Sequence, residues 1–397
     1  MVATGLVGSL LATLFIQVLV AYAALVAPVL APPIAADLGL DPHLIGLFVS
    51  LVYGVAACSG LLSGGFIHRY GAMRVSQACL VLSALSMALL SLGSLSALLL
   101  AALAIGAGYG PVTPASSAIL ARGTPPKWLN LVFSIKQTGV PLGYMLAGVC
   151  LPALTLWAGW RWASLSGAAI CLVFAISLEA MRAETDRERD PMRPVLSLGH
   201  VLRPLRMIFA TPAIRRLAFA SFVFAGMQSS LSTFLVTFLN RDLGMTLVAA
   251  GIVLSFSQMG ATAGRILWGV VADRLAPPMT VLGGLGLAMG LLALLTGMAS
   301  TTWPFAVVIA VSICFGATAG AWNGVHLAQL ARLAPPGQAG EVTGGTFFLT
   351  FAGVMVTPSL FSLVLGLTDS FLIGYALVGG IAAAAGLSIL FLRERSR

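Results

Sequence analysis

Apolar stretches of about 20 residues recur along the chain, and short polar breaks separate them. Each stretch is long enough to cross a hydrocarbon core of roughly 30 Å as an α-helix. The pattern predicts twelve membrane-spanning helices, at approximately 7–33, 44–66, 73–93, 97–121, 129–153, 162–181, 213–239, 247–271, 279–298, 303–330, 341–365 and 371–392.

One longer polar segment, AETDRERDPMRPVLSLGH from Ala183 to His200, interrupts this pattern between the sixth and seventh spans. Its mixed charges and prolines indicate a linker without a core of its own. We therefore predict an N-terminal six-helix bundle at 1–182, a cytoplasmic linker at 183–212 and a C-terminal six-helix bundle at 213–397. The linker residues Val201 to Met207 form either a solvated loop or a short interfacial helix.

The composition agrees with a membrane protein, because 59% of the 397 residues are hydrophobic and only 8% are charged. No soluble globular domain has such a composition, so the predicted fold class is all-α integral membrane. The five cysteines lie in apolar stretches with neither metal-ligand spacing nor a pattern typical of disulfides. We therefore expect no metal site.

The net charge of +9 reflects topology rather than nucleic-acid binding. Of the 21 Lys and Arg residues, 17 fall in alternate loops and the C-terminal tail, which includes Arg395 and Arg397. The opposite loops hold only Arg161 and Arg241. The positive-inside rule then predicts a multi-pass protein of the cell (inner) membrane with both termini in the cytoplasm. No basic residue precedes the first apolar stretch, so we expect a retained span rather than a cleaved signal peptide.

The two halves of the chain contain matching motifs. Arg69 in GGFIHRYG and Arg274 in GVVADRLA are 205 residues apart, as are Lys136 in KQTGVPLGYMLAGV and Glu341 in EVTGGTFFLTFAGV. LARGTPP and LARLAPP follow at an offset of 210. Three such agreeing offsets indicate a parallel duplication of six helices.

Twelve spans, a central cytoplasmic loop and paired loops of this kind resemble the major facilitator superfamily of secondary transporters. The resemblance covers the whole chain. It implies two six-helix bundles that rock about a central cavity during alternating access, with the first, fourth, seventh and tenth helices lining that cavity.

The resemblance also implies a gate in the paired loops. The second loop keeps the family's acidic and basic pair as Asp273 and Arg274, whereas the first has His68 where the family usually has Asp. An acid in this loop can face the positive end of a neighbouring helix, so we expect Asp273 to be the main latch. Alternatively, these charges only flank the spans and set topology. The expected gating residues are Arg69, Gly71, Gly269, Asp273, Arg274 and Glu341.

Within the superfamily, GPVTPASSAIL, SIKQTGVPLG and GRILWGVVADR are similar to sequences of the monocarboxylate transporter family and related organic-anion porters. Those families place an arginine in the eighth helix four residues before a glycine, and Arg265 and Gly269 match this spacing. The acid that often lies one turn before the arginine is absent, since that position holds Ala261.

Lys136 and Arg265 lie inside predicted spans, where a charge costs on the order of 2.5–3.5 kcal/mol. No Asp or Glu occupies the middle of any predicted span. An anionic substrate would supply the missing negative charge, and a guanidinium fork matches a carboxylate. The alternatives for Lys136 are that it snorkels to water or pairs with Glu341, its repeat partner.

Other polar residues lie on the predicted cavity helices, although many such side chains only bond to neighbouring backbone. Asn323 and His326 share a helix face, and His326 is the candidate for proton coupling. The predicted substrate-binding residues are Arg265, Lys136, Tyr109, Gln228, Asn323 and Trp322. Gln17, Tyr22, Thr113 and Ser229 are further candidates to complete the site.

The sequence predicts a transporter rather than an enzyme, because it has neither paired buried carboxylates nor a nucleophile–base arrangement. A Gly-rich phosphate loop is also absent, so we expect neither ATP drive nor any cofactor. We predict a monomeric secondary transporter that moves a small, monocarboxylate-like organic anion with a proton. The alternative is a proton-driven exporter of drugs or metabolites. TGVPLG partly resembles the antiporter motif of such exporters, although the embedded carboxylate that a cation exporter needs is not visible.

Overall fold

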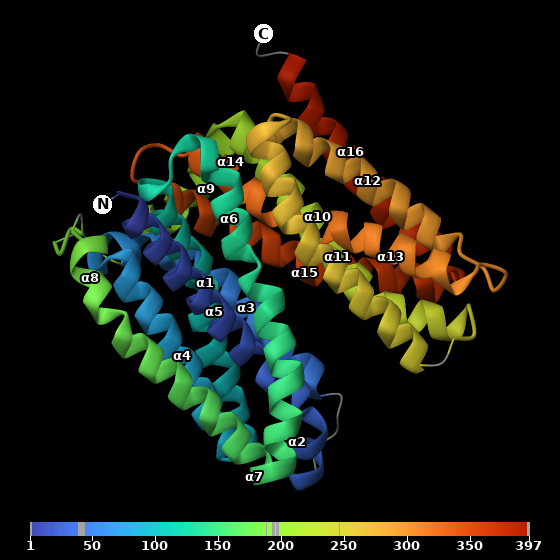
Figure 1. Ribbon diagram of the computed structural model, residues 1–397, viewed down its shortest axis with the longest axis horizontal. Helices are drawn as coiled ribbons and strands as arrows, with labels where there is room; N and C mark the ends of the chain where they lie inside the picture. The colour runs from blue at the N-terminus through green and yellow to red at the C-terminus, as the bar shows by residue number, and fades with distance from the viewer. Residues whose placement is uncertain are drawn as a thin grey trace. The chain divides into compact units, whose positions relative to one another are not determined.

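The computed structural model describes residues 2–38, 44–187, 189–192, 195, 198–245 and 247–394. Every regular element in these ranges is helical (Figure 1). The elements are α1 Val2–Val29, α2 Ala31–Leu38, α3 Leu44–Tyr70, α4 Ala72–Ser91, α5 Leu95–Gly123, η1 Pro126–Trp128, α6 Leu129–Gln137, α7 Gly139–Ser177, α8 Glu179–Thr185, α9 Leu198–Ala210, α10 Pro212–Arg241, α11 Leu247–Arg274, α12 Pro278–Gly297, α13 Phe305–Ala319, α14 Asn323–Leu333, α15 Ala339–Thr368 and α16 Phe371–Glu394.

Ten helical stretches of the described chain are long and apolar enough to cross a membrane. One of them, Pro126–Ser177, contains Gly159 at φ +83°, where the backbone leaves the helical conformation and separates two spans. The 28-residue α11 lies where the eighth span is predicted. The described part of the chain thus has a helix at each of the twelve predicted positions, and the predicted all-α membrane fold is confirmed.

The described helices group into two compact units. Unit 1 consists of Met1–Thr124, Lys136–Met207 and Ala334–Phe348, and unit 2 consists of Pro125–Ile135, Ile208–Leu333 and Leu349–Arg397. Two short segments, at the start of the fifth span and at the start of the eleventh, therefore pack with helices from the other half of the sequence. The domain boundaries at residues 182 and 213, which follow the repeat, remain a prediction.

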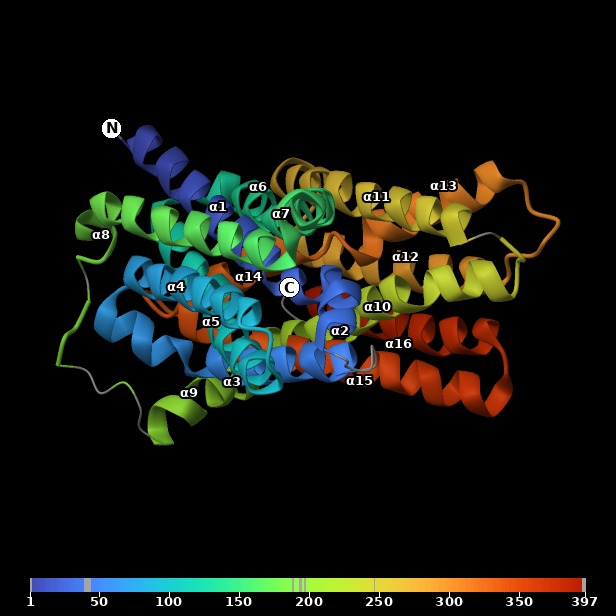
Figure 2. The same cartoon turned by 90° about the horizontal axis from the view of Figure 1, so that it is seen from below.

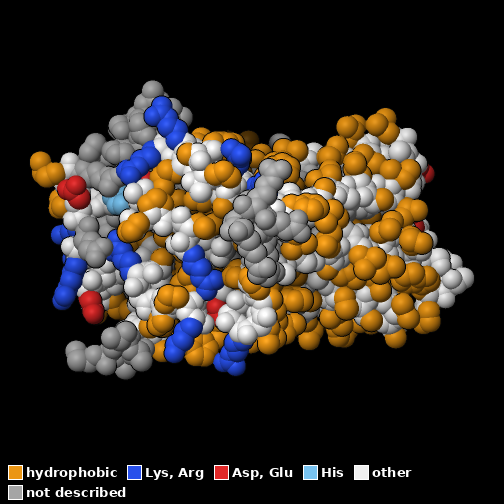
Figure 3. Space-filling view, turned by 90° about the horizontal axis from the view of Figure 1, so that it is seen from above, with side chains coloured by type: hydrophobic (Ala, Val, Ile, Leu, Met, Phe, Trp, Pro, Cys, Tyr) orange, Lys and Arg blue, Asp and Glu red, His pale blue; other side chains and the backbone are white. Residues whose placement is uncertain are grey.

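Within unit 1, α4 packs between α5 and α7, while α1 packs on α5 and α7 (Figure 1). Within unit 2, α12 runs beside α16 and α11 runs beside α13 (Figure 2). Large apolar side chains also point outward, and Val173 and Ile176 on α7 are 68% and 74% exposed. Figure 3 shows apolar side chains over most of the right-hand part of one face, with Lys and Arg gathered toward the left and centre. Such an apolar exterior suits contact with lipid.

The linker contains one helix in a segment for which the sequence allowed either a helix or a loop. Residues 198–210 form the 13-residue helix α9, so Val201 to Met207 are helical and the loop interpretation is wrong. That this helix lies at the membrane interface stays a prediction. The orientation of the termini stays a prediction, and Arg395 and Arg397 lie outside the described residues.

Candidate functional site

The fifth span lacks one backbone hydrogen bond next to Lys136. α6 ends at Gln137 and α7 begins at Gly139, with Thr138 between them. Pro141 explains the missing bond, because it has no N–H to donate to the carbonyl of Gln137. Thr138 keeps a helical backbone, at φ −64° and ψ −16°, and Leu142 N donates to its carbonyl oxygen at 3.1 Å. The helix therefore continues from α6 into α7, and Lys136 lies just before the carbonyl that Pro141 leaves without its usual donor.

The structure buries the Lys136 side chain inside unit 1, at 1% exposure. Its Nζ donates hydrogen bonds to Gln17 Oε1 at 2.7 Å, Gln137 Oε1 at 3.1 Å and Thr113 Oγ1 at 3.4 Å. These oxygens come from α1, the end of α6 and α5. The sequence named Gln17 and Thr113 as candidates but missed Gln137, whose position directly after Lys136 was the available signal.

Three tyrosines of unit 1 meet near Tyr109, which lies on α5 four residues before Thr113. The ring of Tyr109 meets the ring of Tyr53 edge to face at 6.1 Å, and the Tyr53 and Tyr144 hydroxyls lie 3.4 Å apart. Tyr53 on α3 and Tyr144 on α7 were not predicted. Tyr22 and Tyr109 are half-buried.

The tenth span, in unit 2, is broken. α13 ends at Ala319 and α14 begins at Asn323, in a stretch whose glycines lower the helix propensity. Arg265 on α11 is 3% exposed, and its Nε donates to the carbonyl oxygen of Gly320 at 2.8 Å. Trp268 Nε1, less than one turn later, donates to Ala317 O at 2.7 Å. Arg265 thus stabilises the broken helix, a role that the sequence did not predict.

Trp322, Asn323 and His326 surround the start of α14. Trp322 packs edge-on against Phe224 and His326, with ring centroids 5.7 and 5.2 Å away. His326 Nε2 lies 3.0 Å from Leu217 O, so it is the protonated nitrogen, and Nδ1 has no hydrogen-bond partner among the described residues. Asn323 Nδ2 donates to Gln228 Oε1 at 3.4 Å. Ser229 is separate from this pair and donates to Val354 O.

Unit 2 contains the predicted latch residue Asp273, whose side chain is 2% exposed. Its two carboxylate oxygens accept hydrogen bonds from Asn130 N at 3.2 Å and Leu131 N at 2.7 Å. Asn130 Nδ2 donates to Asp273 at 2.6 Å, and Arg332 Nη2 lies 3.5 Å away. Asp273 therefore caps the N-terminus of α6 with a negative charge, as the helix dipole favours.

Two further residues of α11 support the same contact. A Cβ on Gly269 would lie 2.7 Å from Ser134 Oγ, so the glycine permits α11 to approach α6. The guanidinium of Arg274 lies over the ring of Trp128 at 5.4 Å.

In unit 1 the equivalent contact uses different chemistry. His68 Nε2 lies 2.8 Å from Glu341 Oε1, and Arg203 Nε lies 3.4 Å from Glu341 Oε2. Glu341 is in the first turn of α15 and its side chain is 5% exposed. Thus the acid that the first loop lacks is supplied by the helix that the loop faces. Arg69 lies 5.6 Å from the ring of Tyr70.

Asp186, which the sequence did not single out, caps α4 in unit 1. Its carboxylate accepts from Met73 N at 2.9 Å and Arg74 N at 3.0 Å. Gly71 adopts φ +97°, and a Cβ there would lie 2.1 Å from the Asp186 carboxyl carbon. Burial raises the pKa of the Asp186 carboxyl, although the two backbone N–H groups oppose the rise.

These features define a multi-pass membrane carrier with one broken span and two contacts between a repeated loop motif and the start of another helix. A family model described as the Major Facilitator Superfamily matches residues 10–358. The chain belongs to this superfamily, and it is a transporter rather than an enzyme. Among the described residues, no group of three or more His, Cys, Asp and Glu could hold a metal ion.

Curated relatives of the chain are remote and differ in substrate. A hexuronate transporter of Bacillus subtilis is 23% identical over 91% of this chain and 88% of its own length. A probable nitrate/nitrite transporter, NarK2 of Mycobacterium tuberculosis, is 26% identical over 78% of this chain and 77% of its own. The multidrug efflux pump Tap of Mycolicibacterium fortuitum is 25% identical over 89% and 83%.

Solved structures share the fold at lower identity. The fucose:proton symporter FucP of E. coli has a TM-score of 0.78 at 16% identity, over 98% of this chain and 99% of that chain. The human organic anion transporter MFSD10 has a TM-score of 0.76 at 18% identity, over 97% and 99%.

Proposed function

We propose that this secondary transporter moves a small organic anion of the monocarboxylate type together with a proton. The observation that carries the proposal is the buried ammonium of Lys136, which donates hydrogen bonds to Gln17, Gln137 and Thr113 inside unit 1. These hydrogen bonds hold the ammonium in one position. A buried positive charge in a transporter commonly marks the path of a transported ion.

Two further observations support an anionic cargo. Arg265 is a second buried cation, and its Nε donates to the carbonyl oxygen of Gly320. Terminal N–H groups are the donors with which arginine grips a carboxylate. In addition, two of the three relatives described above are named for anions, hexuronate and nitrate/nitrite.

Proton coupling has a candidate in His326. Its Nε2–H is directed to a backbone carbonyl, which leaves Nδ1 as the atom that can accept a proton. A monocarboxylate that enters with one proton crosses without net charge, so this stoichiometry suits an anion carrier.

The test is uptake by the purified protein in proteoliposomes. Monocarboxylates, hexuronates, nitrate and aromatic acids are compared, and cationic drugs are included. We expect saturable uptake of a carboxylate that is lost in Lys136→Met, an apolar side chain of similar length. Gln137→Ala, which removes only one of the neutral oxygens, should retain uptake with weaker affinity. Equal uptake by wild type and Lys136→Met would contradict the proposal.

The second candidate function, proton-driven drug export, has one specific observation in its favour, the similarity to the pump Tap. The same proteoliposomes distinguish anion uptake from drug export. Proton-driven extrusion of a cationic drug, without uptake of any acid, would replace the anion proposal.

A further inference from the structure

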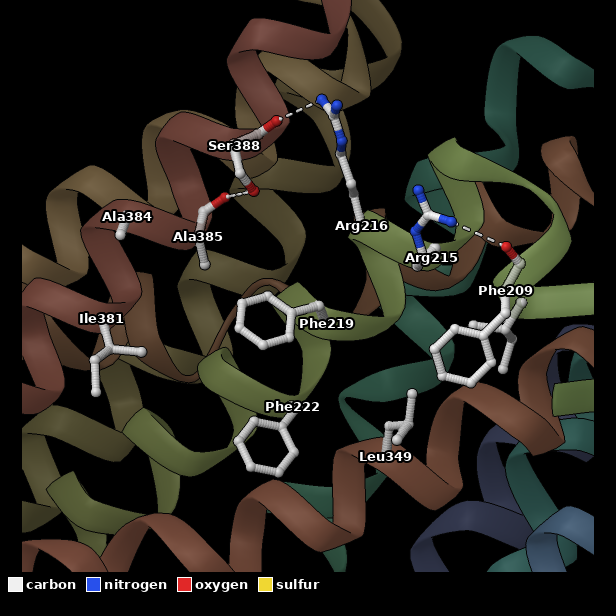
Figure 4. A pocket seen from close by; sticks show the side chains of 11 residues that line it. Phe209, Arg215, Arg216, Phe219, Phe222, Leu349, Ile381, Ala384, Ala385 and Ser388 are labelled. Atoms are coloured by element: carbon white, nitrogen blue, oxygen red, sulfur yellow. Dashed lines mark hydrogen bonds between the residues drawn. The ribbon is translucent and has the colours of Figure 1, made fainter.

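Unit 2 contains a cavity of about 710 Å³ that none of the residues discussed above lines. The end of α9, the first part of α10, and residues of α15 and α16 form its walls. Its apolar lining includes Ile208, Phe209, Phe219, Phe222 and Ile381. Figure 4 shows Arg215 and Arg216 above the rings of Phe219 and Phe222 in that view.

The two arginines are held in place by backbone carbonyls. Arg215 Nη1 donates to Phe209 O at 3.1 Å, and Arg216 Nη1 donates to Ser388 O at 3.1 Å. In the part of the chain that the structure describes, neither forms an ion pair with a carboxylate. Because a guanidinium has five N–H donors, both retain donors for a further acceptor. Two adjacent positive charges therefore lie at one end of an apolar cavity.

The apolar part continues from the charges along one helix face. Arg216, Phe219 and Phe222 are three residues apart in turn, so Phe222 lies about 9 Å along α10 from Arg216 at 1.5 Å per residue. Phe219, on the membrane-spanning α10, is 55% exposed. An exposed aromatic ring on a membrane-spanning helix suits contact with lipid.

We propose that this cavity binds an anionic phospholipid. Its phosphate accepts hydrogen bonds from Arg215 and Arg216, and one acyl chain lies along Phe219, Phe222 and Ile381. Arginine forks match phosphate geometry, and basic pockets beside membrane helices bind anionic headgroups. A free phosphate would satisfy the arginines but leave the apolar walls exposed. The lipid satisfies both parts of the cavity.

The test measures lipid binding to the purified full-length protein in detergent by native mass spectrometry. The probes are dioleoylphosphatidylglycerol, dioleoylphosphatidylcholine and glycerol phosphate, the last being a headgroup without acyl chains. We expect phosphatidylglycerol to bind more tightly than phosphatidylcholine. Arg215→Gln/Arg216→Gln should weaken phosphatidylglycerol binding about 30-fold, or roughly five-fold for each arginine, and leave phosphatidylcholine binding unchanged.

Two further variants separate a lipid site from surface charge. Arg122→Gln/Arg187→Gln removes two exposed arginines from a unit 1 cavity whose lining also holds the carboxylate of Glu184, and it should retain phosphatidylglycerol binding. Ala384→Phe fills the proposed acyl path at an exposed alanine and should weaken binding of both lipids with all charges intact.

Three results would overturn the proposal. They are an equal loss of phosphatidylglycerol binding in both double variants, full lipid binding by Ala384→Phe, and binding of glycerol phosphate as tight as that of the lipid, which would indicate a phosphate site. Thermal unfolding checks the fold of each variant. If Arg215→Gln/Arg216→Gln does not fold, lipid binding by Ala384→Phe and glycerol phosphate binding by the wild type still test the proposal.

Discussion

At the scale of single residues, Arg265 combines two roles that substitution can separate. Its Nε–H stabilises Gly320 O at the helix break, and the proposed function assigns the guanidinium to a carboxylate. Arg265→Lys keeps the charge but loses the paired donors. We expect anion affinity to fall about ten- to a hundred-fold, because a charged hydrogen bond contributes about 1.5–3 kcal/mol. Equilibrium binding of the best anion from the uptake screen measures this.

Trp268→Phe is the matched control for the structural role. It removes the hydrogen bond to Ala317 O at the same break but leaves Arg265 in place. Both variants should lower the temperature of thermal unfolding, whereas only Arg265→Lys should weaken anion binding. A folded Arg265→Lys protein that binds as tightly as wild type would make the residue purely structural.

The residue scale also marks a limit of the sequence. Periodicity placed Lys136 and Arg265 inside spans, and both are buried. Gly320, the partner of Arg265, and Asp186, the cap of α4, could not be predicted, because they depend on where helices break and which segments meet. Nothing in the linear pattern relates Asp186 to the backbone of Met73, 113 residues away in the chain.

At the scale of helices, the capping of α6 by Asp273 leads to a prediction for a variant of this residue. The two backbone donors of α6, Asn130 N and Leu131 N, use different carboxylate oxygens. Asn at this position has one acceptor oxygen and no charge, so Asp273→Asn can satisfy only one of them. We expect faster amide hydrogen exchange in residues 125–135 and slower transport. Hydrogen–deuterium exchange with mass spectrometry, beside initial uptake rates, checks both.

Two variants show whether the effect is local. Asp186→Asn weakens the α4 cap by the same chemistry and should raise exchange near Met73 without affecting residues 125–135. Arg332→Gln removes the ion pair with Asp273 but leaves the Asp273 cap of α6 intact. Amide exchange in residues 125–135 should therefore change less in Arg332→Gln than in Asp273→Asn. Unchanged exchange and transport in Asp273→Asn would remove the latch hypothesis.

Asp186 also predicts a pH dependence of stability. Burial raises the pKa of this carboxyl in the folded protein above its ordinary value of about 3.9. The folded state therefore binds the proton more tightly than the unfolded state, and the contribution of Asp186 to stability is full below the ordinary pKa. This contribution is lost as pH rises through the folded pKa.

Thermal unfolding in detergent, from pH 3.5 upward over roughly three pH units, tests whether the contribution of Asp186 to stability falls as pH rises. Relative to Asp186→Asn, the wild type should lose unfolding temperature as pH rises and then reach a plateau. Arg182 and Arg189 lower the pKa of Asp186, so Arg189→Gln should move the transition to higher pH. A constant difference in unfolding temperature between wild type and Asp186→Asn across this range would show that the pKa of the Asp186 carboxyl is the same in the folded and unfolded protein.

At the scale of the whole molecule, the sequence predicted the twelve spans and the repeat because both rest on hydrophobic length and on fixed offsets. It did not predict how the repeat is used. At the same offset, Asp273 pairs with helix N–H groups in unit 2, whereas His68 pairs with the Glu341 side chain in unit 1. The acid lies in the last turn of α11 in unit 2 and in the first turn of α15 in unit 1, and only folded contacts relate the two positions.

Coupling is the property that involves the complete transport cycle. If one proton enters with one monocarboxylate, no net charge moves, so an inward proton gradient should drive accumulation and a membrane potential alone should not. Proteoliposomes with an imposed pH gradient or a potassium diffusion potential distinguish the two driving forces.

His326→Gln tests which group carries the proton. The glutamine retains an N–H donor for Leu217 O but cannot accept a proton as His326 Nδ1 can. This variant should exchange anions across the membrane but no longer accumulate them in response to the pH gradient. Net uptake that carries negative current and ignores the pH gradient would instead identify a uniporter or an anion exchanger. Normal accumulation by His326→Gln would assign the proton to the substrate or to another group.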